Sequence, residues 1–278
     1  MLSYQHGYHA GNFADVIKHC ALTRLLNYLT QKDKPLFYLE THSGKGLYDL
    51  WNWQAEKTSE YKEGIQLIWS NQKQLPVVFK EYLNTIKQLN VANSLRFYPG
   101  SPYLAINALR PIDRAYFCEL HPTEFDTLKT TPQLHKRVHF SNSDGMNSLN
   151  ALLPPPEKRG LIFIDPSFEI KDEYKTIPQA LKNALSKFNQ GVYCLWYPVV
   201  NKKLTEQLLR RLQQIGIRNT LRIEFHLTTK LQDGMTGCGL WLINPPYILA
   251  NEMRIVCESL KNYFNPRESS YIIEAHEK

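Results

Sequence analysis

The sequence has no long apolar run and few cysteines. No stretch of its 278 residues suggests a transmembrane helix, and the polar, aromatic segment 1–11 has no signal-peptide core. The five cysteines are scattered, odd in number and without close pairs: Cys20, Cys118, Cys194, Cys238 and Cys257. This pattern argues against a disulfide framework or a zinc site. We therefore expect buried free thiols, no metal, no membrane partner and a cytoplasmic protein.

Internal repeats, low-complexity segments and a charged tail are also missing. Hydrophobic residues make up 43% and charged residues 21% of the chain, as in an ordinary globular protein that can bury a sizeable core. The formal net charge is +7, and the lysines are spread along the sequence rather than gathered in a tail. Any basic surface must therefore be assembled by folding, and the charge modestly favours a nucleic acid over a neutral metabolite as partner.

Apolar strand-like segments alternate with helical ones along most of the chain. Asn12 is expected to cap a helix that runs from Phe13 to Thr30, with Asp15 in its first turn. We expect strands at 36–40, 115–119, 137–140, 160–165, 192–197, 221–227 and 239–244, and further helices from Ser101, over 174–188 and 204–215, and at the end. This order predicts an α/β fold with a mainly parallel, doubly wound sheet of the Rossmann-like type.

The pattern changes between residues 48 and 97. Three tryptophans and two periodic segments, 59–71 and 75–90, predict helices there rather than strands. We therefore divide the chain into three parts. They are 1–47 (amino-terminal tail, first helix and first strand), 48–97 (a small helical insertion subdomain) and 98–278 (the remainder of the core). Such insertions often carry substrate contacts; a passive lid or packing module is the alternative.

Two strand ends predict a pocket for a nucleoside cofactor. Glu40 leaves an apolar strand into a turn that holds Gly44 and Gly46, whose backbone can approach a ligand closely although the third glycine of the dinucleotide fingerprint is lacking. Glu119 ends the next core strand, where its carboxylate can accept hydrogen bonds from ribose hydroxyls.

Two further positions complete the predicted pocket. Asp144 follows the third strand and can accept from an adenine amino group, while Gly145 leaves room for the ring. Ser101 is expected to cap a helix that has Pro102 at its first position, and to face the same crevice. Ligands bind outside the carboxyl ends of strands in such sheets, so these residues together favour S-adenosylmethionine as cofactor.

The segment Asp165-Pro166-Ser167-Phe168 predicts the chemistry. An exocyclic amine on a planar base is a poor nucleophile because its lone pair is delocalised into the ring. Hydrogen bonds to the Asp165 carboxylate and the Pro166 carbonyl would make that lone pair available, and the Phe168 ring would stack on the base for in-line attack on the sulfonium methyl. The sequence therefore predicts a methyltransferase that acts on the amine of a nucleobase.

A rival motif, Asn244-Pro245-Pro246-Tyr247, matches the amino-methyltransferase pattern better in its letters. It follows the last expected strand, which in this class is usually a late edge or antiparallel element remote from the reacting methyl group. We therefore favour Asp165 over Asn244 as the catalytic residue.

Six motifs occur in the order found in a known family. They are GNFADVIKH (11–19), ETHSGKG (40–46), YPGSP (98–102), ELHP (119–122), IDP (164–166) and LWYP (195–198). With these motifs the chain, from Met1 to about Tyr247, resembles the RlmJ family. These bacterial enzymes methylate an adenine amine (N6) in 23S ribosomal RNA.

The resemblance implies a class I S-adenosylmethionine-dependent methyltransferase that modifies adenine 2030 of 23S ribosomal RNA. It also implies a monomer that acts on protein-free RNA without a metal. Asp165, Pro166 and Phe168 would carry the reaction, and Tyr4 and Lys18 would contact the RNA. The implied cofactor contacts are His19, His42, Gly44, Ser101, Glu119, Asp144, Gly145 and Asp165.

Two departures from the family pattern are visible. Ser167 and Phe168 replace a proline and a tyrosine, and Lys45 stands in the glycine turn close to where a cationic cofactor would bind. Two alternatives therefore stay open. One is a methyltransferase for DNA adenine or a small molecule, and the other is a catalytically silent RNA-binding protein.

Overall fold

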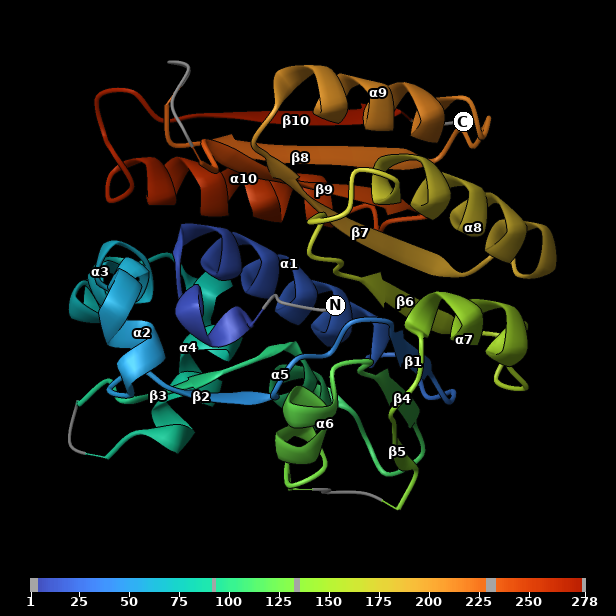
Figure 1. Cartoon of the computed structure of the whole chain (residues 1–278), viewed down its shortest axis with the longest axis horizontal. Helices are drawn as coiled ribbons and strands as arrows, with labels where there is room; N and C mark the ends of the chain where they lie inside the picture. The colour runs from blue at the N-terminus through green and yellow to red at the C-terminus, as the bar shows by residue number, and fades with distance from the viewer. Residues whose placement is uncertain (1–4, 92–93, 133–135, 229–233, 277–278) are drawn as a thin grey trace.

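An eight-stranded sheet forms the centre of the molecule (Figure 1). The computed structural model describes residues 5–91, 94–132, 136–228 and 234–276. The sheet order is β10-β8-β9-β7-β6-β1-β4-β5. The strands are β1 (Phe37–Glu40), β4 (Arg114–Cys118), β5 (Val138–Ser141), β6 (Gly160–Ile164), β7 (Val192–Val199), β8 (Thr220–His226), β9 (Gly237–Ile243) and β10 (Ser270–His276). Strands β5, β4, β1, β6 and β7 run parallel, whereas β9 is antiparallel to both β7 and β8, and β10 is antiparallel to β8.

Strands β1 and β6 are buried at every residue and β7 at most of them, which explains their nearly continuous apolar sequences, whereas β4 and β5 are partly exposed. In β1, Phe37 and Leu39 belong to one hydrophobic core cluster and Tyr38, between them, belongs to the other. The chain leaves β1 toward β4 and β5, then returns to add β6 on the other side of β1. This reversal of strand order is the position at which open α/β sheets bind ligands.

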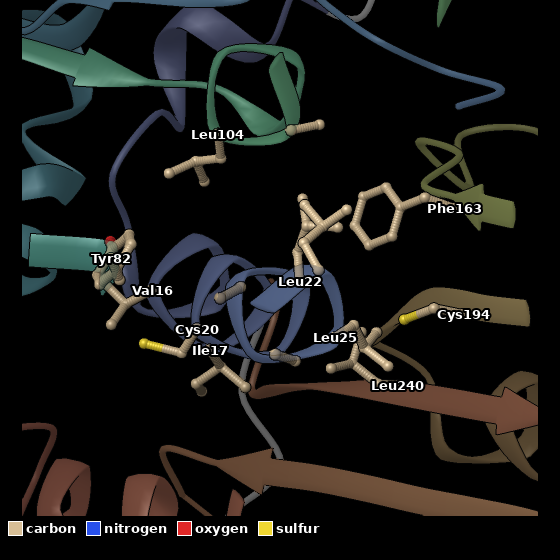
Figure 2. Close-up of a cluster of buried hydrophobic side chains, with 14 of the residues drawn as sticks. Val16, Ile17, Cys20, Leu22, Leu25, Tyr82, Leu104, Phe163, Cys194 and Leu240 are labelled. Carbon is tan, nitrogen blue, oxygen red and sulfur yellow. The ribbon is translucent and has the colours of Figure 1, made fainter. Parts of the chain in front are cut away.

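Helices cover both faces of the sheet. On one face lie α1 (Phe13–Leu29), α5 (Ser101–Ala108) and α10 (Leu249–Lys261); on the other lie α7 (Gly145–Leu152), α8 (Glu173–Lys187) and α9 (Lys202–Gln213), while α6 (Pro122–Leu128) follows β4. Figure 2 shows α1 surrounded by side chains from several elements, among them Tyr82, Phe163 and Leu240. Because it is covered on nearly every side, α1 is apolar on nearly every side.

The segment after β1 holds short helices rather than two long ones. It contains α2 (Trp53–Thr58), α3 (Ile65–Ser70) and α4 (Lys80–Leu89), with one 3-10 turn between α2 and α3 and two between α3 and α4. Gly64 interrupts the first predicted helix, because its backbone angles lie outside the helical region. A two-stranded sheet that the sequence did not predict, β2 (Leu47–Asp49) with β3 (Phe97–Pro99), closes the base of this insertion.

The insertion shares its core with the rest of the molecule. Tyr61, Ile65 and Phe79 belong to the same buried cluster as the side chains of α1. Among the described residues, 3-10 turns lie at His6–Tyr8, Glu60–Glu63, Gln72–Gln74 and Val77–Phe79. The division of the chain at residues 47 and 97 stays a prediction.

The mainly parallel, doubly wound α/β sheet is confirmed, and the expected elements occur with ends shifted by a few residues at most outside the insertion. The expected final helix occurs as α10, but a strand that the sequence did not predict, β10, follows it. One expectation was wrong, because Gly100 and not Ser101 is the N-cap of α5. All five cysteines are free and buried, as expected. Within the described residues, no helix combines the length and apolarity that crossing a membrane requires.

Candidate active site

Two cavities meet at the carboxyl edge of the parallel strands. The first, of about 450 Å³, lies over the ends of β1, β4 and β6. The second, of about 950 Å³, lies between α1, the insertion and the start of α9. They share four lining residues: His6, Lys18, Asp165 and Ser167. The site therefore has two chambers with a common wall that contains the predicted catalytic carboxylate.

The first cavity gathers every residue that the sequence predicts to contact the cofactor. These residues are His19, His42, Gly44, Ser101, Glu119, Asp144, Gly145 and Asp165. Seven of them come from five strand ends and helix starts, His19 comes from within α1, and parallel packing brings them to one edge of the sheet. Their grouping supports the predicted pocket, while the role of each residue stays a prediction.

Glu119 holds the glycine turn in place. Its two carboxylate oxygens each accept a backbone hydrogen bond of 2.7 Å, one from the Gly44 N–H and one from the His121 N–H. Burial raises the pKa of Glu119. Gly44 has a φ of +60°, and a Cβ there would stand 2.5 Å from the Tyr48 hydroxyl, so the turn requires glycine. Each Glu119 oxygen keeps a lone pair that can accept from a ribose hydroxyl.

Asp144 and Gly145 have structural tasks besides the predicted ones. Asp144 caps α7 by accepting a 2.8 Å hydrogen bond from the Met146 N–H. A Cβ on Gly145 would lie 2.0 Å from the Thr41 carbonyl oxygen. Gly145 is therefore required by the close approach of α7 to the turn after β1, whether or not a ring binds beside it.

Glu40 lies directly beneath the first cavity and is fully buried. It accepts hydrogen bonds from the Tyr38 hydroxyl at 2.8 Å and from the Ser101 hydroxyl at 2.5 Å. Burial raises the pKa of Glu40 to about 8, even though both hydroxyls favour the charged form. The Ser101 hydroxyl, expected to cap α5, is instead directed to this carboxyl group.

Two of the histidines that line this pocket, His19 and His42, carry no positive charge at neutral pH. Burial lowers the pKa of His19 to about 3, and its Nδ1 lies 2.8 Å from the Tyr98 hydroxyl. Burial also lowers the pKa of His42, whose Nδ1 lies 2.7 Å from the Thr41 hydroxyl. Two neutral imidazoles suit a pocket for a cationic sulfonium, because they add no repulsion.

Lys45 is turned away from the first cavity and does not line it. Its ammonium donates to the Gln54 side-chain oxygen at 3.0 Å and lies 3.4 Å from a carboxylate oxygen of Glu124. Glu124 is buried, and its oxygens accept no hydrogen bond from a described residue. The charge that Lys45 brings to the turn is therefore compensated inside the protein.

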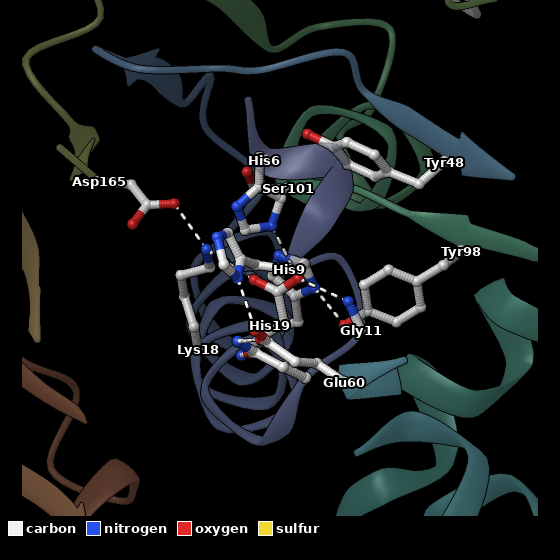
Figure 3. A network of polar contacts seen from close by, with 12 residues as sticks. His6, His9, Gly11, Lys18, His19, Tyr48, Glu60, Tyr98, Ser101 and Asp165 are labelled. Atoms are coloured by element: carbon white, nitrogen blue, oxygen red, sulfur yellow. Dashed lines mark hydrogen bonds and ion pairs between the residues drawn. The ribbon is translucent and has the colours of Figure 1, made fainter. Parts of the chain in front are cut away.

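Asp165 is held by an ion-pair chain from α1 (Figure 3). The Lys18 ammonium lies 2.7 Å from one Asp165 oxygen and 2.9 Å from Asp15, and Asp15 also accepts from His6 at 2.8 Å. Burial lowers the pKa of Lys18, but the two carboxylates outweigh it and raise the pKa overall. Burial raises the pKa of Asp15, but the charges of His6 and Lys18 outweigh it and lower the pKa well below its usual range.

These ion pairs hold Lys18 in a position that the sequence did not predict. Its side chain is only 5% exposed, so it lies in the common wall of the two cavities rather than on the outer surface. A signal was present, because Asp15 and Lys18 stand one turn apart near the start of a helix that is mostly buried. Tyr4, the other residue expected to contact RNA, lies outside the described residues.

Pro166, Phe168 and Trp196 line the second cavity beside Asp165. Trp196, within the LWYP motif, was not predicted as a site residue. Its ring centroid lies 5.6 Å from the Lys18 ammonium, and its indole N–H is buried without a hydrogen-bond partner among the described residues. This cavity therefore has aromatic side chains in its wall. Next to Asp165 it also has a hydrogen-bond donor without a described partner, the Trp196 indole N–H.

Phe168 is packed into the protein rather than open to a ligand. Its side chain is 7% exposed, and its ring centroid lies 4.7 Å from that of Tyr174 in α8. Its φ of +54° is unusual for a residue other than glycine. In this arrangement most of the ring face is covered, so the predicted stacking on a base requires the loop after β6 to move.

The rival motif lies at the opposite edge of the sheet. Residue Ile243, at the end of β9, pairs with Tyr193 near the start of β7, because the two strands are antiparallel. Asn244 donates hydrogen bonds to the carbonyl oxygens of Asn189 and Gly191. Its side chain therefore serves a loop far from Asp165, in agreement with the position expected from the sequence.

The chain is similar to known proteins over most of its length. A family model described as ribosomal RNA large subunit methyltransferase D, RlmJ, matches residues 33–274. Two relatives are named ribosomal RNA large subunit methyltransferase J. The Escherichia coli K12 protein is 41% identical over 267 residues, and the Haemophilus influenzae Rd protein is 42% identical over 268 residues; each match covers 96% of this chain and 95% of the relative. A crystal structure of a Legionella pneumophila protein, 60% identical, superimposes with a TM-score of 0.93 and covers 97% of this chain and 99% of the other.

Proposed function

Because the chain belongs to the RlmJ family of ribosomal RNA large subunit methyltransferases, we propose that it methylates the exocyclic amine (N6) of an adenine in 23S ribosomal RNA. The methyl donor is S-adenosylmethionine, bound in the first cavity. The proposal includes adenine 2030 as the target and a monomer acting on protein-free RNA.

The observation that carries this proposal is the common wall of the two cavities. Direct transfer requires the sulfonium and the amine to approach each other from two sides, with the reacting atoms nearly in line. The first cavity collects the cofactor-type contacts, and the second, larger and partly aromatic, can admit a base. They share Asp165, so the amine would be held by the residue that also borders the donor.

Asp165 would act as an acceptor rather than as an obligate base. One of its oxygens is occupied by Lys18 at 2.7 Å, which leaves the other oxygen, together with the Pro166 carbonyl, to accept from the two amine hydrogens. The nitrogen lone pair then forms the new N–C bond while the S–C bond breaks and S-adenosylhomocysteine leaves. The positive charge that develops on nitrogen is stabilised by the carboxylate, and the product loses one proton afterwards.

Lys18 and Asp15 position this carboxylate. A buried ammonium between two carboxylates has little freedom to turn, and His6 restrains Asp15 from the other side. The Asp165 oxygens are thereby fixed before substrate binds, which lowers the reorganisation required during transfer.

The substrate class is tested by transfer of a radiolabelled methyl group. We expect labelling of naked 23S ribosomal RNA and little or none of DNA, or of a reaction without added acceptor. Equal labelling of DNA, or labelling of a small molecule in its place, would favour the first alternative. Cofactor binding without transfer to any acceptor would favour the silent RNA-binding protein.

The catalytic assignment is tested by Asp165→Asn. This change should abolish transfer and leave the affinity for S-adenosylhomocysteine within a few-fold of wild type, as measured by calorimetry. Tyr247→Ala is the matched control, because Tyr247 belongs to the rival motif and is 81% exposed. Retained turnover in Asp165→Asn, or its loss in Tyr247→Ala, would reject the assignment.

A further inference from the structure

The positive charge of the molecule is concentrated in one stretch of the folded chain. Residues 169–219 carry nine lysines and arginines against four aspartates and glutamates. This stretch therefore holds five of the seven excess positive charges of the chain. It contains α8, β7 and α9, and β7 is almost entirely buried, so the charge lies on the two helices and their loops.

The lysines of this stretch are exposed and available. Lys171, Lys175, Lys182, Lys202 and Lys203 make no ion pair with another described residue. By contrast, several arginines elsewhere bind carboxylates at 2.5–2.9 Å: Arg24, Arg96, Arg110, Arg114 and Arg222. An unpaired surface cation needs no partner for stability, but a cluster of them attracts a polyanion.

The exposed faces of α8 and α9 border both cavities. The two helices pack against each other and lie side by side in Figure 1. Thr176 and Ala180 of α8 line the first cavity, while Asn201 and Leu204, on either side of Lys202 and Lys203, line the second.

On the side of the insertion, the second cavity is lined by two carboxylates, Glu60, which is paired with His9 at 2.8 Å, and Glu63, which is exposed. A phosphate backbone would be repelled there and attracted on the α8–α9 side. Lys202 and Lys203 also occupy the first turn of α9, which contains no acidic residue, so they oppose the helix dipole. A phosphate bound beside them would remove that unfavourable interaction.

We propose that the outer face of α8 and α9, with Lys171, Lys175, Lys182, Lys202 and Lys203, binds the phosphate backbone of the RNA next to the target nucleotide. The insertion does not carry these contacts. The inference rests on the proposed function and adds the surface on which the RNA lies. Phosphate contacts of this kind fix the position of a nucleic acid, while the cavity selects the base.

The test removes three charges from each surface in turn. The first variant is Lys175→Gln, Lys202→Gln, Lys203→Gln. The matched control is Lys73→Gln, Lys80→Gln, Lys87→Gln, which removes three exposed charges from the insertion. For both variants and the wild type, the Kd for naked 23S ribosomal RNA is measured over a range of salt concentrations, and S-adenosylhomocysteine binding is measured by calorimetry.

The affinity for RNA falls as salt is added, so log K, with K the association constant, has a negative slope against log salt. In the α8–α9 variant this slope should be less steep by about 2–3, since each lost phosphate contact accounts for roughly 0.7–0.9. Its Kd for RNA at physiological salt should rise about tenfold or more, with cofactor affinity unchanged and the control close to wild type. An unchanged slope in the first variant, or an equal loss in the control, overturns this inference while wild-type methylation of RNA leaves the proposed function intact. A wild-type protein that neither binds nor methylates RNA overturns both.

Discussion

Glu40 is a carboxyl group that the fold removes from water completely. It sits at the end of β1 with the Tyr38 and Ser101 hydroxyls as donors, and burial raises its pKa to about 8. At neutral pH the folded protein therefore keeps this group largely protonated, whereas the unfolded chain ionises it near its ordinary pKa of about 4.5. The folded state binds this proton more tightly than the unfolded state does.

This difference predicts a pH dependence of stability. The contribution of Glu40 is fully favourable below about pH 4.5, declines as the pH rises toward 8, and changes no further above it, since the unfolded state alone loses the proton in this window. Glu40→Gln should remove this contribution to the pH dependence. From pH 5 to pH 8, the free energy of unfolding of the variant should therefore rise by a few kcal/mol relative to that of wild type. Urea unfolding at pH 5, 6.5 and 8 measures the effect. Parallel curves for the two proteins would contradict it.

Single residues of the site differ in how far the sequence predicts them. Glu119 and Asp165 were predictable because each follows an apolar strand, and strand ends converge in a parallel sheet. The pairing of Lys18 with Asp165 was not, because 147 positions separate them and the contact depends on how α1 lies across the sheet. The direction of Lys45 depends in the same way on Glu124 of α6.

The loop after β6 is the element on which the chemistry depends. It carries Asp165 on its first position and returns to the core at Phe168, which packs on Tyr174 at the start of α8. Packing of Phe168 thus fixes the far end of the loop, as the ion pair with Lys18 fixes the near end.

Phe168→Ala separates packing from base stacking. If the ring serves the core, its removal should lower the free energy of unfolding by about 3–5 kcal/mol, the usual effect of deleting a buried phenylalanine side chain. Chemical denaturation measures this, and Phe168→Leu, which keeps most of the volume, should lose much less. If unfolding changes by less than about 1 kcal/mol while RNA affinity falls, the ring stacks on the base and the loop opens in the complex.

The insertion shows where element prediction fails. The periodic segment 75–90 correctly contains α4, because its apolar positions recur on one helical face. The segment 59–71 divides into a 3-10 turn and α3, because Gly64 lies against the backbone of Gly11 and Asn12. Such a close approach between distant segments leaves no periodic signal in the sequence.

At the scale of the whole molecule, one eight-stranded sheet forms the centre, and the last strand along the chain, β10, is one of its two edge strands. The alternation of strands and helices predicts the parallel part, since each crossover packs back on the sheet. Strand β10 escaped prediction because it is half exposed and its position is set by pairing with β8 over seven residues, Ser270 to His276.

Deleting residues 270–278 should therefore destabilise the molecule and expose β8 as a free edge. We expect the melting temperature to fall by about 10 °C and the protein to associate in a concentration-dependent way, because β8 carries apolar side chains and unpaired backbone groups. Glu274→Gln, which removes only the ion pair with Arg222, is the control and should behave nearly as wild type. Calorimetry and size-exclusion chromatography report the two effects, and an unchanged, non-associating deletion variant would contradict the role of β10.

The common wall of the two cavities has a consequence for inhibition. A compound that joins adenosine through its N6 to the methionine-bearing half of the cofactor would occupy both chambers across Asp165 and Ser167. Once one half is bound, the other is present at an effective concentration in the millimolar range, so the conjugate should bind far more tightly than either half alone. Its inhibition would be competitive against the methyl donor and against RNA, whereas each separate half would compete with one of them only.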